Sequence, residues 1–308
     1  MRIYTITLNP AYDVHAYTEH FAPFHENLAT VTSREAGGKG VNLSRALQNG
    51  GTENTAVIVL GADNCGEFKA ELKKAGLTTL LLEKPGRIRE NLTLHCADAP
   101  ETRISFSGFP ANDSLLEEVA ALLEVDDTTI ITFTGRVASG MSITKVKAFL
   151  KALQAKGAKI VLDSKSFSIE DIFEIQPWLI KPNQEEISDY LGCEVNTIAE
   201  AKENAHVFAN HGVVNVMVSL GEQGAMLLHN GHCYMAVPPV INAISTIGAG
   251  DSSLAGFIAA TKKGCDAAQC LRHAVTYGTA ACMTEGSLPP TAADIAAIYP
   301  QVKLLQLS

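Results

Sequence analysis

The sequence lacks long apolar runs and closely spaced cysteines. No apolar run approaches the length of a membrane-spanning helix, and residues 1–6 do not begin the long apolar stretch of a signal peptide. The seven cysteines are odd in number, scattered along the chain and contain no Cys-x-x-Cys pair, which is typical of reduced thiols. These absences predict a cytoplasmic protein without a membrane partner.

Positive charge is scarce as well. The chain has 24 lysines and arginines against 33 aspartates and glutamates, which gives a formal net charge of −9. This balance argues against a broad surface for nucleic acid, so an anionic small molecule would need its own local arginines or lysines. The 308 residues are 46% hydrophobic and contain no repeat, low-complexity tract or linker. We therefore expect one domain spanning residues 1–308 with a large core.

Two common phosphate-binding motifs are missing. A Walker loop needs Gly-x-x-x-x-Gly-Lys-Ser/Thr, and neither Gly248 nor the stretch from Gly37 to Gly40 supplies it. A dinucleotide fingerprint would place Gly or Ala where Ser253 stands. A phosphate site in this chain must therefore be built differently.

The stretch 245–256 offers such a site. Small residues run directly into an apolar helical pattern, which predicts a loop that leads into a helix N-terminus. Gly248, Ala249 and Gly250 have little side chain to shield their N–H groups, so these donors can converge on one anion. Asp251 follows them. Its carboxylate either caps the helix or, beside a bound phosphate, accepts a proton from a hydroxyl group.

Apolar β-branched runs alternate with helical patterns, which is typical of an α/β protein with a mostly parallel central sheet flanked by helices. We expect a hairpin at 225–228 and 232–237 to add an antiparallel edge to this sheet. Segments at about 14–35 and 88–107 have no helical period and predict strands of a small β-sheet lid. The central strands are expected at 3–8, 56–60, 77–82, 129–133, 159–162, 178–181 and 213–220, and the helices after 40 and 250, from 184, and at 66–75, 113–123, 142–156, 266–283 and 291–299.

Polar residues near the start suggest a ligand site. Asp13 follows the first strand and its Asn-Pro turn, and ligands gather at the carboxyl ends of parallel strands, although Asp13 could equally be a turn residue. The glycine-rich stretch 36–40 would let a ligand approach the main chain, while Lys39 and Asn42 could bind hydroxyls or a phosphate. The alternative is a glycine turn with a surface lysine.

Two later features also have two interpretations. Arg87 and Arg89 are either edge-strand charges or a clamp for a phosphate ester. Asn183 and Glu186, three positions apart at a helix start, form a capping box, hold waters around a magnesium ion, or do both.

Together, these motifs resemble the ribokinase-like PfkB carbohydrate kinases. The stretches 36–42 and 245–251 resemble the two family signatures, and segments 7–13, 89–91, 181–186 and 219–224 follow the family's order. The opening Thr-Leu-Asn-Pro with Gly-Gly-Lys-Gly is most similar to the branch that holds 1-phosphofructokinase and tagatose-6-phosphate kinase. The resemblance implies a ribokinase-like fold with a lid that closes over the sugar.

The resemblance also implies roles for individual residues. It makes Asp251 the general base, with Gly248, Ala249 and Gly250 as the anion hole. Asn183 and Glu186 would organise Mg²⁺. Apart from the resemblance, the apolar Phe21 and Phe24 of the lid suggest a homodimer that buries them against a second subunit. Acceptor contacts would come from Asp13, Gly37, Gly38, Lys39, Asn42, Arg89 and Arg136, and nucleotide contacts from Lys181, Asn183, Ser219, Gly221, Gly224, Gly248 and Gly250.

One loop departs from the family pattern. Close relatives usually have Gly-Ser-Leu-Pro-Pro-Gly where this chain has residues 135–140, which include Arg136. Arg136 either strengthens phosphate binding or signals a different acceptor. The resemblance implies an ATP-dependent kinase for fructose 1-phosphate; the alternatives are tagatose 6-phosphate, an unphosphorylated sugar or nucleoside, and a sugar-phosphate sensor without turnover.

Overall fold

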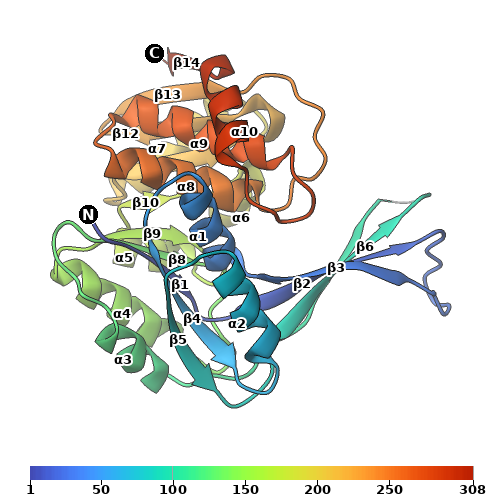
Figure 1. The fold of residues 1–308 in the computed structure, drawn as a ribbon. Coiled ribbons are helices and arrows are strands. Elements are labelled where there is room, and N and C mark those ends of the chain that lie inside the picture. The colour runs from blue at the N-terminus through green and yellow to red at the C-terminus, as the bar shows by residue number, and fades with distance from the viewer. Residues whose placement is uncertain (99, 308) are drawn as a thin grey trace.

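The computed structural model describes residues 1–98 and 100–307. Its strands form a large sheet that runs through the body and a small sheet that projects from it (Figure 1). In the described part of the chain, the large sheet has ten strands in the order β14-β13-β12-β11-β10-β9-β8-β1-β4-β5. Their bounds are β1 (Ile3–Thr7), β4 (Thr55–Gly61), β5 (Thr79–Lys84), β8 (Ile130–Thr134), β9 (Lys159–Asp163), β10 (Leu179–Ile180), β11 (Asn215–Ser219), β12 (Ala225–His229), β13 (His232–Val237) and β14 (Lys303–Leu307).

The strands from β5 to β11 pair in parallel, whereas β12, β13 and β14 form an antiparallel edge. This arrangement confirms the predicted α/β class and the predicted edge hairpin. Within the described residues, no helix is both long enough and apolar enough to span a bilayer.

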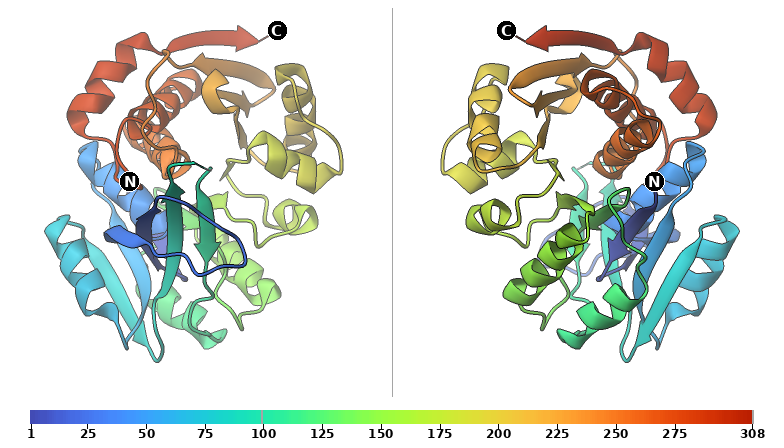
Figure 2. Two further views of the ribbon diagram at one scale, coloured as in Figure 1. Left: turned by 90° about the vertical axis from the view of Figure 1, so that its right-hand side faces the viewer. Right: turned by 90° about the vertical axis from the view of Figure 1, so that its left-hand side faces the viewer.

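Helices cover both faces of the large sheet (Figure 2). Helices α1, α8, α9 and α10 pack on one face, with α2 beside α1, and the remaining helices cover the other. The helices are α1 (Lys39–Asn49), α2 (Cys65–Lys74), α3 (Ser114–Ala121), α4 (Ile143–Ala155), α5 (Ile169–Ile175), α6 (Gln184–Leu191), α7 (Ile198–Asn210), α8 (Ala249–Lys262), α9 (Ala267–Ala281) and α10 (Ala292–Ile298), with short 3₁₀ turns at Gly221–Gln223 and Tyr299–Gln301.

Strand β4 explains why the central strands are apolar throughout. Its side chains alternate between the two faces of the sheet, and both faces are covered. Val57 and Val59 are fully buried in the layer with α3 and α4, while Ala56 and Ile58 are fully buried beneath α2. A covered parallel sheet therefore leaves no solvent-facing side on which polar residues would alternate.

The small sheet is the predicted lid. Its order is β3-β2-β6-β7, built from β2 (Ala11–Thr18), β3 (Thr30–Gly37), β6 (Arg89–Cys96) and β7 (Thr102–Ser105). The two predicted lid segments thus combine in one sheet, in which β2 of the first segment pairs with β3 of the same segment and with β6 of the second. One detail of the prediction was wrong: Asp13 does not lie in a turn after β1, because the chain re-enters strand at Ala11 and places Asp13 inside β2.

The sequence patterns did not identify α5, α7 or β14. Helix α7 begins with a capping box between Thr197 and Glu200, which is a readable signal. The edge strand β14 has no comparable signal, since its position depends on pairing with β13. Edge strands of this kind are defined by their partner more than by their own residues.

Candidate active site

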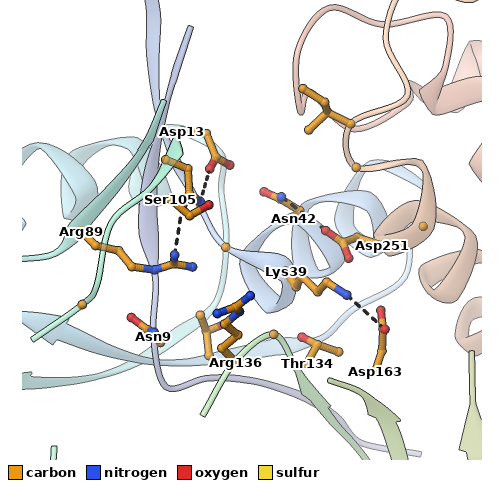
Figure 3. Close-up of a pocket in the computed structure, with 18 of the residues that line it drawn as sticks. Asn9, Asp13, Lys39, Asn42, Arg89, Ser105, Thr134, Arg136, Asp163 and Asp251 are labelled. Atoms are coloured by element: carbon orange, nitrogen blue, oxygen red, sulfur yellow. Dashed lines mark hydrogen bonds and ion pairs between the residues drawn. The ribbon is translucent and has the colours of Figure 1, made fainter. Parts of the chain in front are cut away.

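A cavity of about 690 Å³ lies where the lid meets the carboxyl ends of the central strands (Figure 3). The two glycine-rich motifs meet in it, because the start of α1 and the start of α8 both line the cavity. Of the predicted residues, those lining the cavity are Asp13, Gly38, Lys39, Asn42, Arg89, Arg136, Lys181, Asn183, Gly248, Gly250 and Asp251. The structure thus brings residues from both ends of the sequence to one place.

Asp251 lies in the first turn of α8 and does not cap it. The N-cap position is Gly248, whose φ of 76° is the left-handed conformation that favours glycine, and no side chain caps this helix. The capping alternative is therefore wrong. Asp251 is 7% exposed, and its carboxylate accepts a long 3.4 Å hydrogen bond from the side-chain nitrogen of Asn42.

The surroundings of Asp251 raise the pKa of its carboxylate. Burial raises the pKa of Asp251 to about 7, with Asp163 adding to the increase and Lys39, Lys181 and the hydrogen bond from Asn42 opposing it. A carboxylate with a pKa near neutrality accepts a proton more readily than an ordinary aspartate.

Two lysines and one aspartate form a charged cluster in the lining of the cavity. Nζ of Lys39 lies 3.1 Å from Oδ1 of Asp163, and Nζ of Lys181 lies 3.7 Å from Oδ2 of the same carboxylate. Burial alone would lower the pKa of Lys39, but the charges of Asp163 and Asp251 raise it above its ordinary value. Lys39 is therefore cationic in the cavity.

The N-terminus of α8 faces one of these lysines. A Cβ added to Gly250 would lie 3.2 Å from Nζ of Lys181. The first amides of a helix carry partial positive charge, so an ammonium group placed against them creates a site for an anion. A phosphate group bound there would contact Lys181 and the glycine-rich turn together.

The lid supplies a polar wall on the other side. The side chain of Asn91 donates to Oδ1 of Asp13 at 2.9 Å and accepts from Nη1 of Arg89 at 2.9 Å. Burial raises the pKa of Asp13, while Asn91 and Arg89 oppose the increase. Gly37 does not line the cavity; a Cβ at that position would overlap the Asp13 carboxylate, so the glycine lets β3 pass closely behind it.

Two arginines lie near one another at the lid end of the cavity (Figure 3). Arg89 comes from β6 and Arg136 from the loop after β8. Burial lowers the pKa of Arg89, Asp13 raises it, and the positive charge of Arg136 lowers it. Paired guanidinium groups in a partly buried site are suited to a phosphate ester.

The match to known proteins agrees with this geometry. The model of the pfkB family carbohydrate kinases matches residues 6–293. The chain belongs to the pfkB family of carbohydrate kinases. It is accordingly a phosphotransferase that uses an alcohol group as acceptor.

Individual relatives support the assignment. This pfkB kinase is 30% identical to the 1-phosphofructokinase of Escherichia coli K12 over 83% of each chain, and 29% identical to that of Bacillus subtilis over 99% of this chain and 100% of the relative. Its fold matches a crystal structure of phosphofructokinase-2 from Escherichia coli in complex with substrates and products, with a TM-score of 0.90, 27% identity and coverage of 97% and 99%. The ribokinase-like fold is thereby confirmed.

Several predicted nucleotide residues of this pfkB kinase lie outside the cavity. Ser219, Gly221 and Gly224 do not line it. Ser219 ends β11, where its backbone nitrogen donates to the Pro182 carbonyl at 3.0 Å, and the two glycines follow the strand. The isolated bridge between Asn183 and Ser219 joins this segment to the cavity rim. Ala249 and Glu186 also lie outside the lining, although both are close along the chain to residues inside it.

Asp163 is the main site residue of this pfkB kinase that the sequence patterns missed. It ends β9, at the same edge of the sheet where other polar residues follow parallel strands. The rule that ligands gather at carboxyl ends of strands would have selected it. Arg103 and Ser105 also line the cavity, but they lie on an exposed lid strand whose position depends on pairing with β6.

Proposed function

We propose that this pfkB kinase transfers the γ-phosphoryl group of ATP to a hydroxyl of fructose 1-phosphate, giving fructose 1,6-bisphosphate and ADP. The observation that carries the proposal is the division of the cavity into two ends. Arg89 and Arg136 lie at one end, and Asp251 with the N-terminus of α8 lies at the other (Figure 3). A ketohexose phosphate held by its phosphate at the arginine end presents its far hydroxyl to Asp251.

The chemical step follows from this orientation. Asp251 accepts the proton of the acceptor hydroxyl as the oxygen attacks the γ-phosphorus and the bond to the ADP oxygen breaks. The amides of Gly248, Ala249 and Gly250 stabilise the charge on the transferring phosphoryl group, and Lys181 adds its own charge beside them. Because the transition state of phosphoryl transfer is loose, positioning and charge stabilisation supply most of the acceleration.

The polar lid residues position the sugar. Asp13, with its side chain fixed by Asn91, accepts hydrogen bonds from sugar hydroxyls, and Gly38, Lys39 and Asn42 contact the same part of the acceptor. Closure of the lid over the sugar excludes water and protects ATP from hydrolysis.

The second substrate is ATP, the phosphoryl donor expected of the family. We place its phosphates between Lys181 and the start of α8, with Asn183 at the rim and Ser219, Gly221 and Gly224 along the rest of the nucleotide. The bridge between Asn183 and Ser219 supports one continuous binding path.

Mg²⁺ accompanies ATP in this proposal, with Asn183 and Glu186 as its nearest protein groups. The structure shows them as a capping box: Oδ1 of Asn183 accepts from the Glu186 amide at 2.7 Å, and Oε2 of Glu186 accepts from the Asn183 amide at 3.1 Å. Each oxygen keeps a free lone pair, so the pair fits an ion that retains several of its waters. The ion, when bound, neutralises charge on the phosphates.

The lid also suggests how two copies associate. Phe24 and Leu28 are almost fully exposed and Val31 is mostly exposed, whereas Phe21 is half-buried. An apolar group of this kind on a projecting sheet favours a homodimer through the lid. A cytoplasmic location is part of the proposal, supported by the seven cysteines, which are all free.

One assay tests the substrate. Purified protein is given ATP, Mg²⁺ and, in turn, fructose 1-phosphate, fructose 6-phosphate, tagatose 6-phosphate, fructose and a nucleoside, and ADP release is followed. Turnover highest with fructose 1-phosphate supports the proposal. Preference for tagatose 6-phosphate would contradict the proposed acceptor and indicate that the loop with Arg136 selects a different one. No turnover with any compound would favour the alternative of a sugar-phosphate sensor without activity.

A further inference from the structure

Asp163 holds two ammonium groups that belong to different halves of the cavity. Lys39 begins α1, beside the residues that face the sugar, and Lys181 faces the N-terminus of α8, where the nucleotide phosphates are placed. Both Nζ atoms lie within ion-pair distance of one carboxylate, at 3.1 Å and 3.7 Å. Asp163 is 6% exposed, so these charges interact with little screening by solvent.

The two contacts are unequal. Oδ1 of Asp163 accepts a hydrogen bond from Lys39, whereas Oδ2 is buried without a hydrogen-bond partner, because Lys181 stays at 3.7 Å. A buried carboxylate oxygen without a hydrogen bond is costly unless charge compensates it. Lys181 is therefore held by charge but keeps its own donors for another acceptor.

Asp251 gives Lys39 a competing partner. The Asp251 and Asp163 charges both act on Lys39, and Lys39 in turn acts on Asp251. Without the charge of Asp163, Lys39 would form an ion pair with Asp251, the proposed general base. The ammonium groups of Lys39 and Lys181 would also repel each other. One buried carboxylate prevents both changes.

We propose that Asp163 is a positioning residue that fixes Lys39 toward the acceptor and Lys181 toward the nucleotide, and so couples the two substrate sites. It acts through the lysines and not by touching the reacting atoms. This inference rests on the proposed function for the assignment of each lysine to a substrate. Its distinctive consequence is that one substitution disturbs the binding of both substrates.

The test compares Asp163→Asn, which keeps the shape and removes the charge, with Lys39→Met and Lys181→Met. We expect Asp163→Asn to raise KM for both the sugar phosphate and ATP by about tenfold or more, since it removes the charge that holds both ammonium groups in place. Lys39→Met should raise mainly KM for the acceptor, and Lys181→Met mainly KM for ATP. In a chain that already carries both lysine substitutions, Asp163→Asn should have little further effect on either KM.

Asp171→Asn is the matched control. Asp171 also pairs with a lysine, with Lys147 Nζ at 2.7 Å, but it does not line the cavity. Its substitution should leave both KM values unchanged. If Asp163→Asn is too unstable to purify, the pair Asp163→Asn with Lys181→Met removes one cation, and its acceptor KM should exceed that of Lys181→Met alone.

Three results would overturn the inference. The first is an increase in only one of the two KM values, and the second is a full effect of Asp163→Asn in the absence of both lysines. The third is recovery of Asp163→Asn by raised Mg²⁺, which would make Asp163 a group that acts on the ion. If the wild type shows no turnover, the proposed function fails independently of this inference. Calorimetric binding of ATP to Asp163→Asn then still tests whether Asp163 positions Lys181. An ATP affinity equal to that of the wild type would overturn the inference.

Discussion

The side-chain nitrogen of Asn42 lies 3.4 Å from Oδ2 of Asp251, although 209 positions of sequence separate the two residues. Asn42 belongs to the first turn of α1 and Asp251 to the first turn of α8, and the two helices pack against each other on one face of the large sheet. This contact joins the two glycine-rich motifs into one site. It also places Asn42, the proposed sugar contact, directly beside Asp251, the proposed general base.

Replacing Asp251 by Asn should separate activity from stability. Loss of the base should lower kcat by roughly 10²–10⁴-fold with little change in ATP affinity. Because burial raises the pKa of Asp251 from 3.8 to about 7, the ionised carboxylate destabilises the fold above pH 7, and this penalty disappears as the pH falls toward 3.8. Asp251→Asn should therefore unfold at a higher temperature than the wild type at pH 8 but not at pH 4. Near-normal kcat in this variant would remove Asp251 from the mechanism.

Activity should depend on pH through the same carboxylate. With the pKa of Asp251 at about 7, kcat/KM should fall about tenfold per pH unit below that value, since only the ionised form accepts a proton. Lys39 lowers this pKa, so Lys39→Met should move the acidic limb of the profile to higher pH. A profile that stays flat down to pH 5 in the wild type would contradict this assignment.

The two arginines should determine acceptor affinity. Arg89→Ala and Arg136→Ala should each raise KM for the sugar phosphate by about tenfold or more, because a charged hydrogen bond to phosphate is lost, while KM for ATP stays within about twofold. Arg87→Ala provides the control, since Arg87 is exposed two positions from Arg89 and does not line the cavity. An unchanged acceptor KM in both arginine variants would leave the phosphorylated acceptor without support.

Gly37 should be sensitive to a single added methyl group. A Cβ there would overlap the Asp13 carboxylate and displace it from Asn91, so Gly37→Ala should raise acceptor KM and leave ATP binding intact. Gly66→Ala is the comparison, because its Cβ would meet no atom within 4 Å and it lies in α2. That substitution should preserve activity and stabilise the protein by about 0.4–1 kcal/mol in chemical denaturation.

The exposed apolar residues of the lid should hold two copies together. Leu28→Asp places a charge in this surface and should shift sedimentation toward the monomer, with Glu26→Asp as a substitution in the same loop that adds no charge. If the wild type and both variants all sediment as monomers, the lid dimer is excluded.

The local sequence determined the elements that are buried on both faces and the two glycine-rich turns. The continuous apolar run of β4 predicts a central strand, and the glycines before Asp251 predict a helix N-terminus that is suited to an anion. These features depend on neighbouring residues along the chain. They therefore remain readable without the fold.

Only the tertiary structure decided which of the two interpretations held for several residues. Asp251 could have capped α8, but Gly248 occupies the N-cap position. Asp13 was expected in a turn, but it lies in a lid strand because β2 pairs with β3 and β6. Asp163 acquired its significance when α1 and the segment after β10 brought two lysines to it. Burial and charge pairing between separate segments set these roles, and no local pattern encodes such contacts, which for Lys39 and Asp163 span 124 positions.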